Sequence, residues 1–132
     1  MSAINQKLQN LFNYQGWQYV QTQTGYKVEI VTQNNRTQVV ELNGFNDPDG
    51  LPMVEFVSNI CEVTYARDLV YLLRLNLTLP YGAIALKNDY VVMRATQLVN
   101  TADDEELKRL TYYVALQADQ LESQAKGGAD QF

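Results

Sequence analysis

Histidine is absent from this 132-residue chain, and cysteine occurs once, as Cys61. Without histidine, neither Ser-His-Asp nor Cys-His catalysis is available. One thiol and no imidazole also supply too few ligands for structural zinc. A single cysteine cannot close an intrachain disulfide, so we interpret Cys61 as a buried apolar side chain in a protein of a reducing compartment. Carboxylate-based catalysis remains as a remote alternative, and we expect no enzyme activity, no metal and no cofactor.

Long apolar runs and concentrated positive charge are also missing from the sequence. No apolar stretch approaches the roughly 18 residues of a membrane span, and no charged-then-apolar leader opens the chain. The net charge is −5, because 15 acidic residues outnumber 10 scattered basic ones. An acidic surface repels the phosphate backbone of nucleic acids. The sequence therefore predicts a cytoplasmic protein that binds neither nucleic acid nor a membrane.

Two acidic segments could be taken for cation sites, but local structure explains both. Asn46-Asp47-Pro48-Asp49-Gly50 begins like a calcium loop and lacks its closing Glu. These residue types favour a turn, since Asp bonds its own backbone and Gly accepts a positive φ. Asp103-Asp104-Glu105-Glu106 follows Thr101 where a helical pattern begins, so the acids complement the helix dipole, and Thr101 with Asp104 resembles a capping box.

The hydrophobic periodicity predicts one α+β domain over residues 1–126 and a flexible tail over 127–132. The fold class is an antiparallel sheet of five to six strands with three helices, written most simply as α-β-β-β-α-β-β-α, although three or four strands fit before the middle helix. The expected elements are a first helix with Ile4, Leu8, Leu11 and Phe12 on its apolar face, strands near 17–23, 26–30, 39–42 and 53–61, a helix over 65–77, a hairpin of 82–87 and 90–97, and a last helix with an apolar stripe from Leu107 to Leu121.

The run from the middle helix into the hairpin carries a family resemblance. Leu73-Arg74-Leu75-Asn76, followed by Leu79-Pro80-Tyr81-Gly82-Ala83-Ile84-Ala85-Leu86, resembles the YbjN-type branch of the type III secretion chaperone-like fold. Arg36-Thr37-Gln38-Val39-Val40 is similar to the central strand entry of that branch. The resemblance implies that the two outer helices lie against one face of the sheet and that the middle helix joins two copies.

The middle helix is apolar on more than one side, so it needs cover on more than one side. One side can rest on the sheet, and a second copy about a two-fold axis is the simplest cover for another. We therefore predict a homodimer, and the alternative is a middle helix fully wrapped within a monomer. The predicted dimer interface consists of Val70, Tyr71, Arg74, Leu75 and Leu77.

Nine tyrosines, one tryptophan and many side-chain amides favour a surface that contacts other proteins. By resemblance, the chain looks like a non-catalytic chaperone, adaptor or assembly factor that holds an extended or tail segment of a client protein. A regulatory, signalling-linked interaction module without an unfolded client is the second interpretation. The client is predicted to dock on Phe12, Trp17 and Tyr19, and secondarily on Tyr112 and Tyr113; the alternative is that all five are core or dimer contacts.

Overall fold

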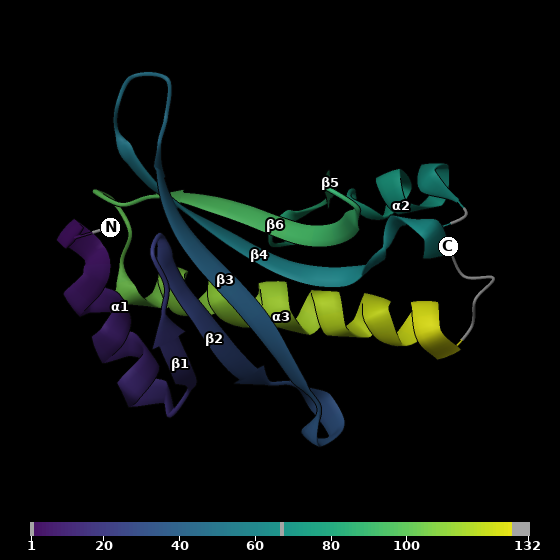
Figure 1. Cartoon of the computed structure of the whole chain (residues 1–132), viewed down its shortest axis with the longest axis horizontal. Helices are drawn as coiled ribbons and strands as arrows, with labels where there is room; N and C mark the ends of the chain where they lie inside the picture. Colours follow the sequence, from purple (N-terminus) through teal and green to yellow (C-terminus); the bar gives the residue numbers. More distant parts are fainter. Residues whose placement is uncertain (1, 67, 128–132) are drawn as a thin grey trace.

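The computed structural model describes residues 2–66 and 68–127, which form an α+β fold of three helices and a six-stranded antiparallel sheet (Figure 1). The predicted fold class is thereby confirmed, and the four strands before the middle helix are the larger number that the sequence allowed. Most of the tail predicted over 127–132 lies outside the described residues. The elements are α1 (Ser2–Gln15), β1 (Gln18–Gln21), β2 (Gly25–Val31), β3 (Thr37–Asn46), β4 (Pro52–Glu62), α2 (Leu69–Leu75), β5 (Ala83–Lys87), β6 (Tyr90–Leu98) and α3 (Asp104–Gly127), with short 3-10 turns at Gln33–Asn35 and Val63–Tyr65.

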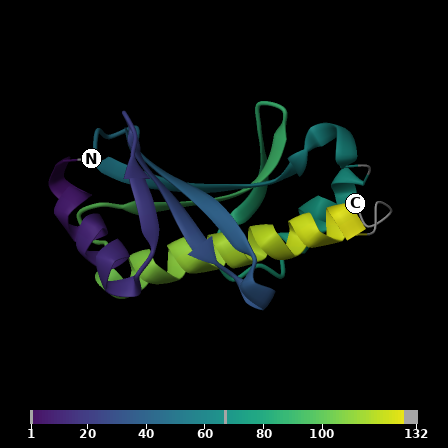
Figure 2. The same ribbon diagram turned by 60° about the horizontal axis from the view of Figure 1, so that its bottom comes forward.

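The strand order β1-β2-β3-β4-β6-β5 places β1 at one edge of the sheet and β5 at the other. Each neighbouring pair is antiparallel. The long helix α3 runs along the sheet, and α1 lies beside the beginning of α3 (Figures 1 and 2). Within the described residues, no helix combines the length and apolar character that a membrane span requires.

The core lies between the sheet and the two outer helices. Alternate residues of β2, β3, β4 and β6 are buried, as expected where one face of a sheet packs against helices. The predicted apolar face of the first helix is buried as well. The largest members of this core are Phe12, Tyr26, Leu42, Phe56, Met93 and Leu107, each at most 1% exposed.

Local capping interactions set the ends of the outer helices. Gly16 ends α1 with a φ of 73°, and the Trp17 N–H donates to the Phe12 carbonyl at 2.9 Å, as in a Schellman motif. At the start of α3, Asp103 Oδ1 accepts the Glu106 N–H at 2.8 Å. The predicted cap at Thr101 is therefore wrong, because the carboxylate of Asp103 stands closer to the first helical N–H groups.

The acidic loop between β3 and β4 is a turn closed by its own side chain. Asp47 Oδ1 accepts the N–H groups of Asp49 and Leu51, both at 2.9 Å. Gly50 has a φ of 81°, which a side chain would make unfavourable. This geometry confirms the turn that the residue types predict, and it commits one carboxylate oxygen of Asp47 to the backbone.

Candidate functional site

The middle helix and the turn that follows it carry several exposed apolar side chains. Asp68 Oδ1 caps the helix by accepting the Tyr71 N–H at 2.9 Å, so α2 begins later than the predicted start at residue 65. Leu72 is 3% exposed and belongs to the core, whereas Leu73 is 66% and Leu77 is 92% exposed. Leu69 and Val70 are exposed as well, and several exposed apolar side chains on one short segment are typical of a surface that another molecule covers.

The residues of the predicted dimer interface divide into two groups. Val70, Arg74 and Leu77 are exposed, and their spacing places them on one side of α2 and the turn that follows it. Tyr71 and Leu75 are half-buried and pack against the core from the other side. The structure thus presents to solvent one face, formed by Val70, Arg74 and Leu77, that a second copy could cover.

An apolar groove of about 300 Å³ lies between α2 and the β5–β6 hairpin. Because β5 is an edge strand, the groove opens along the border of the sheet. The leucine stripe is evident in the sequence, but the groove is not, since its opposite wall comes from a hairpin whose position only the folded chain defines. The walls of the groove include Leu69, Leu72 and Leu73 from α2 and Ile84, Leu86 and Val91 from the hairpin.

The aromatic cluster between α1 and β1 is mostly interior. The Phe12 ring is 0% exposed, with its centroid 5.0 Å from the Tyr19 ring and 5.4 Å from the Tyr26 ring. Direct client contact through Phe12 is therefore wrong, because α1 places this ring beneath its neighbours. Trp17 and Tyr19 are half-buried and pack against the core, so each keeps an accessible part.

The tyrosines of α3 form a second aromatic cluster, with a member that the sequence analysis missed. Tyr113 stacks on Tyr81 at a centroid distance of 4.9 Å and an interplanar angle of 11°, and Tyr112 meets Tyr113 edge-on at 5.2 Å. Gln117 Nε2 donates to the Tyr81 carbonyl at 2.6 Å. These contacts fasten the loop after α2 to α3, and they leave Tyr112 and Tyr113 half-buried.

Strands β3 and β4 separate at one end, where hydrogen bonds from two side chains take the place of backbone hydrogen bonds between the strands. Their pairing extends from Glu41 opposite Val57 to Asn46 opposite Pro52. Beyond it, Gln38 Nε2 donates to the Asn59 carbonyl at 2.7 Å and to Ser58 Oγ at 3.0 Å.

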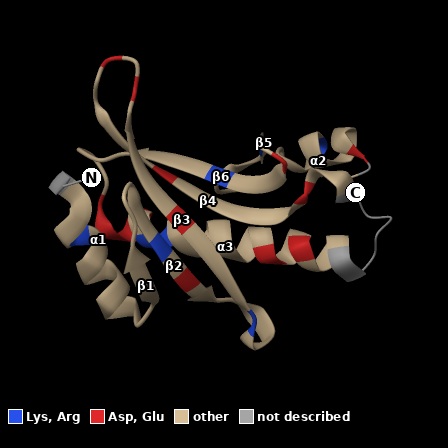
Figure 3. Ribbon diagram, in the orientation of Figure 1, with Lys and Arg blue, Asp and Glu red and all other residues tan. Residues whose placement is uncertain are grey.

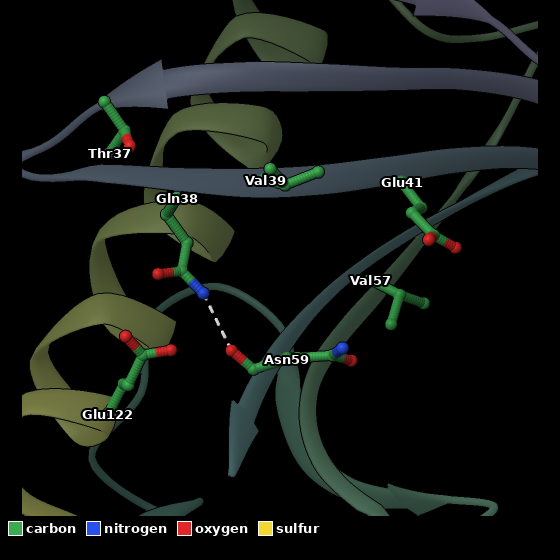
Figure 4. Close-up of a pocket in the computed structure, with 7 residues that line it drawn as sticks. All are labelled: Thr37, Gln38, Val39, Glu41, Val57, Asn59 and Glu122. Atoms are coloured by element: carbon green, nitrogen blue, oxygen red, sulfur yellow. Dashed lines mark hydrogen bonds between the residues drawn. The ribbon is translucent and has the colours of Figure 1, made fainter. Parts of the chain in front are cut away.

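A hollow of about 280 Å³ lies beside this separation (Figure 4). Figure 4 shows Gln38 reaching across to the Asn59 backbone, with Glu122 approaching from α3. The Ser58 hydroxyl donates to the Val39 carbonyl at 2.7 Å, which fills a further backbone acceptor. The polar groups around the hollow thus hold the two strands together across the gap.

Acidic and basic residues are distributed over helices, strands and loops of the described part of the chain (Figure 3). Burial alone would raise the pKa of the Glu55 carboxyl, but hydrogen bonds and charge from Arg94 and Lys87 outweigh it and hold that pKa below its ordinary value. Burial and the charge of Glu122 raise the pKa of the Cys61 thiol, which disfavours a reactive thiolate. Among the residues that the structure describes, no three Cys, Asp or Glu side chains are grouped to hold a metal ion.

Comparison with known proteins does not assign the chain to a group. No family model matches the chain. No curated protein matches it either. The surfaces that indicate a function are the exposed face of α2, the adjoining groove and the two aromatic clusters.

Proposed function

We propose that this protein is a non-catalytic chaperone, adaptor or assembly factor of the cytoplasm, which works as a homodimer and holds a peptide-like segment of a client protein. The apolar surface of α2 and the turn that follows it carries the proposal, because Leu69, Val70, Leu73 and Leu77 are between 49% and 92% exposed. Apolar patches of this kind are typical of sites that bind another protein. The YbjN-type resemblance of the same segment supports the proposal independently.

The face formed by Val70, Arg74 and Leu77 is the proposed dimer contact. The short helix begins with exposed Asp68 and carries exposed Arg74 in its last turn. When two such helices pack antiparallel about a two-fold axis, the basic end of each lies beside the acidic start of the other. The charges of the helix are thus complementary to a second copy of itself.

Affinity capture from the source cells, followed by mass spectrometry, tests the client proposal. One stoichiometric partner, of which an isolated segment binds as well as the whole, is the expected result. Constant association with a folded kinase, receptor or transcription regulator would instead support the second interpretation, a regulatory interaction module. A purified probe complements this experiment: reduced, carboxymethylated α-lactalbumin remains unfolded, so we expect the wild-type protein to bind it.

A substitution at Trp17 tests the predicted docking surface beside α1. We expect Trp17→Ala to keep the fold and the dimer while weakening client binding, because the ring is partly accessible. Tyr14→Ala is the matched control, since Tyr14 is 88% exposed on the same helix end. A loss of about 3–5 kcal/mol in the free energy of unfolding would instead assign Trp17 to the core.

A further inference from the structure

The segment of residues 76–82, which connects α2 to β5, is held at both of its ends. At the first end, the Ile84 N–H donates to Asn76 Oδ1 at 2.6 Å, and Asn76 Nδ2 donates to the Ile84 carbonyl at 3.4 Å. At the second end, Gly82 has a φ of 73°, and a Cβ atom there would lie 2.7 Å from the Arg94 carbonyl oxygen. The segment is therefore tied to β5 at one end and packs closely on β6 at the other.

Tyr81 joins the same segment to α3. Its ring stacks on Tyr113 at a centroid distance of 4.9 Å, and its carbonyl accepts a hydrogen bond from Gln117 Nε2 at 2.6 Å. A hydrogen bond with the Tyr81 side chain is also the largest cause that raises the pKa of the Arg109 guanidinium. Arg109, Tyr113 and Gln117 are spaced by four residues, so they lie on one face of α3. These three side chains, which we call the α3 stripe, thus converge on one tyrosine.

The helix α2 is too short to fix its own orientation. It has seven residues, and isolated helices shorter than about 12 residues are marginal in water. Leu72 is its one buried side chain, whereas Leu69, Val70 and Leu73 are exposed. The orientation of α2 therefore depends on the connections at its two ends, and the segment of residues 76–82 is one of them.

We propose that Tyr81 is a positioning residue for the dimer, because the α3 stripe holds the segment that carries part of the dimer face. Leu77 belongs to this segment, and its N–H donates to the Arg74 carbonyl at 3.1 Å. A surface that is already ordered in the monomer loses less conformational entropy when it associates. Release of Tyr81 from α3 therefore weakens the dimer without removing any contact between the copies. This inference rests on the proposed function and names the residues that tune the affinity of the dimer.

The positioning role differs from the client docking predicted for Tyr112 and Tyr113. Tyr113 stacks on Tyr81, so one face of its ring is covered within a single copy. Tyr112 meets Tyr113 edge-on and packs against the core. Two adjacent tyrosines of one helix therefore form a matched pair, of which Tyr113 stacks on Tyr81 and Tyr112 packs elsewhere.

The dissociation constant of the dimer, measured by sedimentation equilibrium, tests the positioning role. We expect Tyr113→Ala to raise this constant at least tenfold, whereas Tyr113→Phe, which keeps the stacked ring, should change it less than twofold. Tyr112→Ala is the matched control: it removes a ring of the same size, so thermal stability should fall while the dissociation constant changes less than twofold. Gln117→Leu removes the hydrogen bond to the Tyr81 carbonyl at similar volume and should raise the constant at least threefold. This variant decides the question if Tyr113→Ala does not fold.

Amide hydrogen exchange at concentrations where every copy is a monomer gives an independent measure. In Tyr113→Ala, the Leu77 N–H should exchange at least tenfold faster than in the wild type, because the segment that contains it is released. The Leu72 N–H, which donates to the Asp68 carbonyl at 3.2 Å at the start of α2, should exchange at an unchanged rate.

The outcomes separate this role from the proposed function. If the wild type is a dimer but Tyr113→Ala and Gln117→Leu dimerise as tightly, the positioning role is wrong and the proposed function stands. An equal loss of affinity in Tyr112→Ala also contradicts the role, because general destabilisation would then explain the loss. If the wild type is a monomer at micromolar concentration, the proposed dimer and the role of Tyr81 both fail.

Discussion

The Asp119 side chain shows how one buried charge can fasten a loop to a helix. It is 3% exposed, and its Oδ2 atom accepts hydrogen bonds from Thr32 Oγ1 at 2.9 Å and Arg36 Nη2 at 2.9 Å. Arg36 also reaches Ser123 of α3 at 3.3 Å. A carboxylate at this depth depends on its partners, because burial removes the water that would otherwise stabilise it.

We predict that Arg36→Met lowers the free energy of unfolding by about 2–3 kcal/mol, since it strands the Asp119 carboxylate in the interior. The value is below that of a fully buried pair because the Arg36 side chain is 43% exposed. Urea denaturation measures the change. Adding Asp119→Leu to Arg36→Met should recover part of the loss, and equal stability of Arg36→Met and the wild type would contradict the prediction.

Local features could be predicted from the sequence where neighbours along the chain determine them. The Asp47 turn and the Gly16 helix end follow from side-chain chemistry within five residues. The cap of α3 was misplaced because Thr101 and Asp103 both suit a cap, and only the path of the chain decides between them. Phe12 was misjudged for another reason: its burial depends on Tyr19 and Tyr26, which belong to different strands.

At the scale of elements, the turn between β1 and β2 packs closely on β3. A Cβ atom on Gly25 would lie 1.7 Å from the Leu42 carbonyl oxygen, closer than any real contact. Thr24 Oγ1 donates to Asn43 Oδ1 at 2.7 Å, and the Gly44 N–H donates to the Thr24 carbonyl at 3.0 Å. These bonds hold the turn in place, so the backbone cannot move aside easily.

We predict that Gly25→Ala destabilises the fold by more than 3 kcal/mol, because either the turn or β3 must shift. Gly16→Ala is the control: its φ is 73° but its Cβ would meet nothing within 4 Å, so about 1 kcal/mol is expected from backbone strain alone. Thermal unfolding of both variants gives the comparison. A loss for Gly25→Ala no larger than that for Gly16→Ala would show that the turn can relax.

Glu55 links three strands and makes the stability of the fold depend on pH. Its carboxylate on β4 contacts Lys87 of β5 at 3.2 Å and Arg94 of β6. The pKa of Glu55 is lower in the folded protein than its ordinary value of 4.5, so folding favours the ionised form. The resulting stability is present above the unfolded pKa and is lost as the pH falls through the folded pKa.

We therefore expect that, below about pH 4.5, the free energy of unfolding of Glu55→Gln falls less steeply with decreasing pH than that of the wild type. The difference should stay small, because Lys87 and Arg94 are both more than 40% exposed and water screens the pairs. Urea denaturation at a series of pH values measures it. An unchanged pH profile for Glu55→Gln would rule out this carboxyl as a contributor.

The order of elements could be predicted from periodicity, while the separation of β3 from β4 could not. Alternation places Val28, Ile30 and Val40 on one face whichever strand lies beside them. The separation arises because Gln38 and Ser58 satisfy backbone groups that a continuous ladder would use. The α2–β5 groove escaped prediction likewise, since its two walls lie on opposite sides of the Pro80 turn.

At the scale of the whole molecule, the predicted dimer gives a direct test. We expect sedimentation of the wild type at micromolar concentration to give twice the 15.0 kDa mass of one chain. Val70→Asp with Leu77→Asp should yield monomers with unchanged secondary structure, because both side chains are exposed in a single copy. Val20→Asp, at 61% exposure on β1, controls for the added charge. A wild-type monomer at these concentrations would end the dimer proposal.

The position of α3 at the end of the described chain has a consequence for biosynthesis. Lys7 of α1 donates to the Ala102 carbonyl at 2.6 Å, and α3 packs on β3, β4 and β6. Until residues 104–127 have been synthesised, the apolar side chains of β3, β4 and β6 that α3 covers in the folded protein lack that cover. For roughly the one to five seconds that translating this helix takes, the nascent chain is itself an aggregation-prone species in need of shelter.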